Sequence, residues 1–86
     1  MTQTEIRWDL YHRIANKECA QTRSLLLKTR ASSQGQIRFR NVDTGPEALL
    51  ELKQRSGSDQ VPFVHDRLSN QVYLGKEAIA ALAEKI

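Results

Sequence analysis

The chain has 86 residues and a formal net charge of +3, with 40% hydrophobic and 27% charged residues. A chain of this length predicts a single domain over residues 1–86 whose core is too small to enclose a large substrate pocket. Its one cysteine, Cys19, excludes an internal disulfide and a cysteine-rich zinc site. The N-terminus lacks the pattern of a signal peptide, and no apolar run approaches the roughly 18 residues of a membrane span. We therefore expect a cytoplasmic protein without a membrane partner.

Basic residues are concentrated in the first half of the chain. Residues 1–40 contain eight Lys or Arg and three Asp or Glu, whereas residues 41–86 contain five and seven. A basic half can attract an anion, but no nucleic-acid-binding motif accompanies it. We interpret it as a solvated face and expect no nucleic-acid partner. Because His12 and His65 are isolated in the sequence, we also expect no metal site.

The first third of the chain predicts a strand followed by a helix. Apolar and polar residues alternate over residues 6–11, which is the period of a strand. Asn16 is suited to cap a helix that begins at Lys17. We expect the buried face of this helix, widened by Leu25 and Leu27, to contain Cys19, Thr22, Leu26 and Arg30. A polar loop is expected over residues 31–35.

The remaining sequence predicts two further helices and three strands. Residues 36–42 alternate as a strand, and Pro46 marks the start of a helix that ends near Gly57. The buried stripe of that helix is expected to contain Ala48, Leu49 and Leu52. Short strands are expected over residues 61–65 and 72–74, separated by a turn at 69–71. Residues after Gly75 have the apolar spacing of a last helix: Ala78, Ile79, Leu82, Ala83 and Ile86.

The order of these elements predicts the fold class. A strand–helix–strand unit implies two parallel strands joined by a crossover, and the short last connection implies an antiparallel hairpin. We therefore predict an α/β protein with a four-stranded mixed sheet flanked by three helices, which cover both faces.

This order, together with several short motifs, resembles glutaredoxin of the thioredoxin superfamily over nearly the whole chain. Tyr11 ends the first strand, Arg13 follows two positions later, and Val61-Pro62 precedes the third strand. In the family, this proline is cis and faces the active motif. The resemblance therefore implies a thioredoxin/glutaredoxin-like fold with a redox or thiol-binding groove beside Pro62.

The active segment departs from the family pattern. Counted without a gap, the two family cysteines fall on Asn16 and Cys19, so the segment has the form Asn-x-x-Cys. The nucleophilic cysteine is thereby replaced. The closing Gly-x-Asp-Asp-Leu pattern is matched from Gly75 onward, with Glu77 in place of one acid and Ala78 in place of the other.

The resemblance predicts a degenerate module that binds a thiol compound, a peptide or a protein partner with little or no redox turnover. The implied ligand-binding residues are Arg13, Asn16, Val61, Pro62, Gly75 and Glu77. Cys19 is the one candidate catalytic residue. No cofactor is required, although glutathione is a candidate ligand.

A second register stays open at this point. In it, Cys19 is the nucleophile of a Cys19–Thr22 segment followed by Arg23, after an insertion of three residues beyond Tyr11. That register is similar to monothiol glutaredoxins, and more loosely to arsenate-reductase-like proteins. It predicts a glutathione-linked oxidoreductase that uses Cys19 alone.

Overall fold

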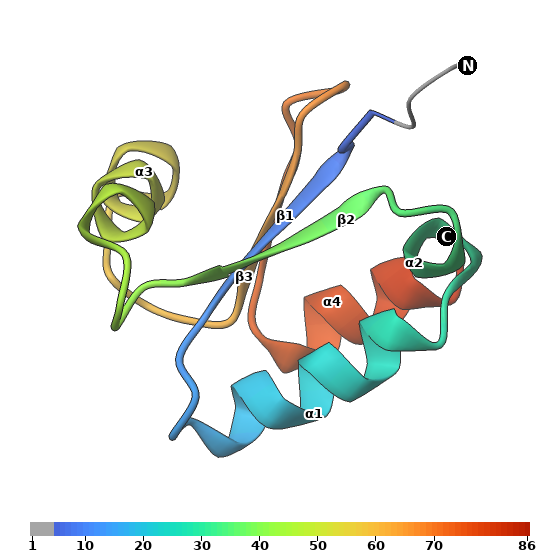
Figure 1. Ribbon diagram of the computed structural model, residues 1–86, viewed down its shortest axis with the longest axis horizontal. Coiled ribbons are helices and arrows are strands. Elements are labelled where there is room, and N and C mark those ends of the chain that lie inside the picture. The colour runs from blue at the N-terminus through green and yellow to red at the C-terminus, as the bar shows by residue number, and fades with distance from the viewer. Residues whose placement is uncertain (1–4) are drawn as a thin grey trace.

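The computed structural model describes residues 5–86, and Figure 1 shows the arrangement of their elements. In chain order these are β1 (Trp8–His12), α1 (Lys17–Leu27), α2 (Arg30–Ser33), β2 (Ile37–Asn41), α3 (Pro46–Ser56), β3 (Phe63–Asp66), β4 (Val72–Leu74) and α4 (Lys76–Ala83). Within residues 5–86, none of the helices combines the length and apolar character that a membrane crossing requires.

The four strands form one mixed sheet in the order β2-β1-β3-β4. The strand β1 pairs in parallel with β2 and antiparallel with β3, and β4 completes an antiparallel hairpin with β3. All five residues of β1 are buried. The predicted α/β class, the parallel pair and the closing hairpin are therefore confirmed.

Helices cover both faces of this sheet. Figure 1 shows α3 on one side of the strands, with α1 and α4 beside each other on the opposite side. Because side chains alternate along a strand, β1 contributes to two cores. One core, on the side of α1 and α4, contains Trp8, Leu10, Leu26, Ala31, Val64, Ile79 and Leu82. The other, beneath α3, contains Tyr11, Val42, Ala48, Leu52 and Phe63.

A fourth, short helix replaces most of the loop that the sequence predicts over residues 31–35. Thr29 begins this helix, because its hydroxyl donates to the Leu26 carbonyl at 2.6 Å and accepts the Ser32 N–H at 3.1 Å. Ala31 is buried and holds the helix against the core. As a result, α1 ends at Leu27, and Arg30 is an exposed residue of α2 rather than part of the buried face of α1.

The buried face of α1 is narrower than its sequence predicts. Cys19, Thr22 and Leu26 are buried, whereas the side chains of Leu25 and Leu27 are 38% and 60% exposed. The prediction that Leu25 and Leu27 widen this face is therefore wrong. Only one stripe of the helix faces the sheet and α4, and residues on either side of that stripe point toward solvent.

Candidate functional site

The loop that follows β1 ends in a well-formed helix cap. Asn16 has extended backbone angles, and its side-chain oxygen Oδ1 accepts the backbone N–H of Cys19 at 2.9 Å. This bond satisfies one of the amides that the first turn of a helix leaves free. Glu18, also in the first turn, lies where a carboxylate interacts favourably with the helix dipole. The prediction that Asn16 caps α1 is confirmed.

Cys19 lies behind this cap as a buried free thiol. Its side chain has no exposed surface, and its Sγ accepts the backbone N–H of Arg13 at 3.4 Å. Burial raises the pKa of the Cys19 thiol, and the amide of Arg13 and the nearby charge of Arg23 only partly oppose that effect. The folded chain therefore holds Cys19 as a shielded thiol, a form that is a poor nucleophile.

The side chain of Arg23, a residue of α1, also contacts the loop that follows β1. Its Nη1 lies 3.0 Å from Nδ1 of the buried His12 and donates to the carbonyl of Arg13 at 3.2 Å. Burial lowers the pKa of His12, and the charge of Arg23 lowers it further. A neutral imidazole can accept from the guanidinium, so the pair fixes the start of the loop.

The charge of Arg13 is already balanced within the protein. Its guanidinium forms an ion pair with Asp43, which lies between β2 and α3. The N–H of Asp43 donates to Oδ1 of Asn41 at 2.9 Å, which fixes the backbone at this carboxylate. A ligand carboxylate at Arg13 would therefore compete with an internal partner.

Four of the six predicted ligand-binding residues line one groove. Arg13 and Asn16 form one side, Val61 and Gly75 come from the segments around β3 and β4, and the cavity has a volume of about 490 Å³. We call this cavity the Asn16 groove. Its other lining residues are Glu18, Asp59, Gln60 and Leu74.

The other two predicted residues lie elsewhere. Pro62 is buried behind the groove, where its carbonyl accepts the N–H of Gly75 at 3.0 Å. The Val61–Pro62 peptide bond is cis. Glu77 lines a separate cavity between α1 and α4, together with Leu25 and Ala80 among others. The structure thus brings Arg13, Asn16, Val61 and Gly75 together, whereas Glu77, in the first turn of α4, lines a different cavity.

Sequence reasoning did not identify Asp43, Asp59 or Leu74 as part of this region. Asp43 lies 30 residues from Arg13 in the chain, and no local pattern links them. Asp59 stands in a polar loop, where an acid is ordinary. Only the assembled sheet brings these residues to the start of α1.

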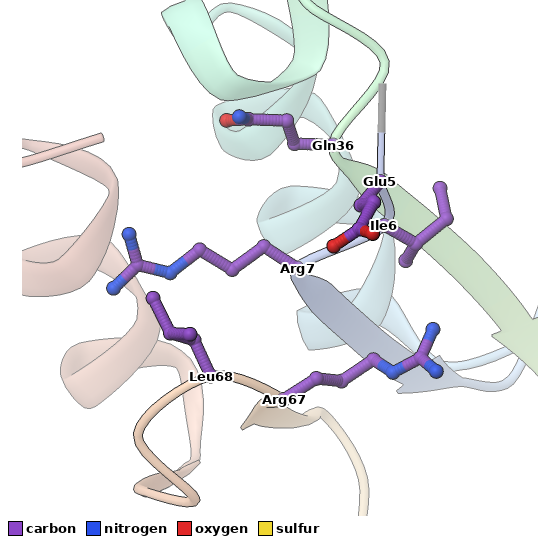
Figure 2. Close-up of a pocket in the computed structure, with 6 residues that line it drawn as sticks. All are labelled: Glu5, Ile6, Arg7, Gln36, Arg67 and Leu68. Atoms are coloured by element: carbon purple, nitrogen blue, oxygen red, sulfur yellow. The ribbon is translucent and has the colours of Figure 1, made fainter. Parts of the chain in front are cut away.

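A third cavity lies at the opposite end of β1, and Figure 2 shows its lining residues. The side chains of Arg7 and Arg67 extend away from each other in this view, so they do not converge on one ligand. Arg7 donates to Asp66 at 3.2 and 3.3 Å and lies 4.5 Å from the centre of the Trp8 ring. This end of the sheet thus contains an ion pair between Arg7 and Asp66.

Asp66 is held in place by several donors at this end. Burial acts to raise the pKa of its carboxyl, but hydrogen bonds from Arg7, from the Ser69 hydroxyl and from backbone amides outweigh burial. The pKa falls to about 2 as a result. Among residues 5–86 there is no cluster of three or more His, Cys, Asp or Glu side chains that could hold a metal ion.

No protein-family model matches the chain, and no curated protein sequence matches it. The sheet order and the placement of the helices are compatible with a thioredoxin-like fold.

Proposed function

We propose that this protein is a glutaredoxin-like module that binds an extended segment of a peptide or protein partner, or a thiol compound such as glutathione, with little or no redox turnover. The observation that carries the proposal is the pair Asn16 and Cys19. Thiol–disulfide exchange requires an accessible thiolate. Asn16 occupies the helix start and has no sulfur, while the sulfur of Cys19 is buried and its pKa is raised.

Binding without turnover is supported by the backbone at Val61. Within residues 5–86, neither the N–H nor the C=O of Val61 forms a hydrogen bond, and Val61 lies in the wall of the Asn16 groove. Free main-chain groups beside a sheet are the groups that an extended peptide pairs with. The adjoining Leu74 is half exposed at the edge strand β4 and offers an apolar contact.

One feature favours the alternative, a monothiol glutathione-linked oxidoreductase that uses Cys19. The Arg13 amide donates to Sγ, and the charges of Arg23 and Arg13 both act to lower the pKa of Cys19. If the loop after β1 opened, these groups would stabilise an exposed thiolate. Binding with turnover and binding without it therefore differ in one measurable property, the reactivity of Cys19 in the folded chain.

The deciding experiment measures the reaction of Cys19 with a small aromatic disulfide, in buffer and in denaturant, across a range of pH. We expect slow reaction in the folded state and rapid reaction after unfolding, since the sulfur is shielded. Glutathione-dependent reductase turnover should be negligible in the wild type. Robust turnover that disappears in Cys19→Ser and persists in Thr22→Ser would refute the proposal and establish the monothiol alternative.

A further inference from the structure

We propose that the Asn16 groove selects a cationic partner, namely an extended peptide segment whose lysine or arginine side chain lies between Glu18 and Asp59. This inference rests on the proposed function and specifies its partner. Arg13 taken alone suggests an anionic ligand, whereas this inference assigns the groove a cationic one.

The charges of the lining residues carry the argument. Arg13 is the one cationic lining residue, and Asp43 neutralises it. Glu18 and Asp59 are exposed, and neither forms an ion pair with another residue in the range 5–86. Once the Arg13–Asp43 pair is counted as neutral, the lining retains two unbalanced carboxylates. Lys17 and Lys76 adjoin the groove in sequence but do not line it.

The two helix starts beside the groove do not restore a preference for anions. At α1, Oδ1 of Asn16 already accepts a first-turn amide, and Glu18 offsets the positive end of the dipole. At α4, the N–H of Gly75 donates to the Pro62 carbonyl, and Glu77 stands in the first turn. Each helix start therefore carries its own carboxylate.

The arrangement of the lining matches an extended chain with one long basic side chain. The unpaired N–H and C=O of Val61 lie next to Asp59 and Gln60 on one side of the groove, and Glu18 lies on the α1 side. A backbone paired at Val61 would project alternate side chains into the groove. The aliphatic stem of a lysine or arginine would pack on the half-exposed Leu74 while its charged end reached the carboxylates.

The test is an NMR titration of the isotopically labelled full chain with two capped peptides. Both are short, extended and uncharged except for a central residue, which is lysine in one and glutamate in the other. We expect the lysine peptide to shift the amides of Glu18, Asp59, Val61 and Leu74. At low salt, the Kd of the lysine peptide should be about three- to tenfold lower than that of the glutamate peptide, because exposed charge pairs contribute little. Salt screens these pairs, so the difference between the two Kd values should shrink as salt is added.

Variants assign the preference to the two carboxylates. The double variant Glu18→Gln with Asp59→Asn keeps side-chain shape and should bind both peptides equally. The matched control Glu84→Gln removes an exposed acid just beyond α4 and should retain the preference for lysine. An amide spectrum that matches the wild type outside the groove shows that each variant is folded.

The outcomes separate this inference from the proposed function. Equal binding of both peptides by the wild type, or tighter binding of the glutamate peptide, would refute charge selection and leave peptide binding in place. A lysine preference that survives in the double variant would also refute the assignment to Glu18 and Asp59. If neither peptide shifts the groove amides at millimolar concentration, peptide binding itself is refuted.

Discussion

The side-chain oxygen of Asn16 accepts the backbone N–H of Cys19 at 2.9 Å, so the residue that caps α1 is bonded to the backbone of the only cysteine in the chain. In a redox-active member of the resembled family, a thiolate would use the amides of this first turn. Here the uncharged side chain of Asn16 accepts one of these backbone N–H groups. The same position therefore serves helix stability instead of nucleophilic chemistry.

Replacement of Asn16 by alanine should destabilise the fold. The Asn16→Ala variant loses the bond to the Cys19 amide, and we expect its free energy of unfolding to fall by about 0.5–2 kcal/mol. Asn16→Asp retains an acceptor at the cap and should remain close to wild type. Urea denaturation monitored by circular dichroism measures both variants. Equal stability of Asn16→Ala and wild type would show that the cap contributes nothing.

Acid should weaken the protein through Asp66. Its pKa is lowered from the usual 3.8 to about 2, so the folded state binds a proton less readily than the unfolded chain. The stability that this carboxylate contributes is therefore complete above pH about 4 and is lost as the pH falls toward 2. Asp66→Asn should lower stability at neutral pH and flatten this part of the pH profile. The control Asp59→Asn, at an exposed acid, should leave the profile unchanged.

A second effect of acid should arise at His12. Its pKa is lowered from 6.5 by burial and by Arg23, so the unfolded chain takes up a proton at a higher pH than the folded chain does. Stability should consequently decline as the pH falls below about 6.5. Arg23→Gln removes the neighbouring charge, and the pKa of His12, followed by imidazole NMR signals, should rise. Arg30→Gln, at an exposed arginine of α2, serves as the control and should not move the pKa of His12.

Two adjacent leucines of α1 should respond very differently to truncation. Leu26 is 1% exposed within the core, whereas Leu27 is 60% exposed. Leu26→Ala should cost about 2–5 kcal/mol, because it removes buried apolar surface and leaves a cavity. Leu27→Ala should change stability by no more than about 0.5 kcal/mol. Thermal or urea unfolding of the two variants measures the loss of stability in each. Similar losses in Leu26→Ala and Leu27→Ala would mean that α1 is rotated from the described orientation.

The same two leucines show where sequence reasoning reaches its limit. Hydrophobic periodicity identifies α1, but three consecutive leucines give no indication of which one faces the sheet. That choice depends on how α4 lies beside α1. The extra helix α2 was missed for a related reason, since Thr29 resembles any other polar residue in a loop until Leu26 and Ser32 are positioned around it.

At the candidate site, the helix cap and some of the groove residues could be predicted, whereas the ion pair of Arg13 could not. Asn16 is a strong helix-capping residue by its chemistry, and the family resemblance implies that Val61 and Gly75 lie near it, as they do in the Asn16 groove. The neutralisation of Arg13 by Asp43 arises from the packing of β1 against β2, which brings the loops after the two strands together. The sequence therefore suggests that the charge of Arg13 is available to a ligand, whereas in the fold it pairs with Asp43.

The position of β1 in the middle of the sheet has a consequence for hydrogen exchange. Its amides and carbonyls pair with strands on both sides, so we expect exchange of its amide protons to require opening of the whole sheet rather than local fraying. Arg13 directly follows this strand, and its amide is held by the sulfur of Cys19. One wall of the Asn16 groove is therefore joined to the strand whose amides we expect to exchange most slowly, and we expect that wall to move little while the sheet is intact.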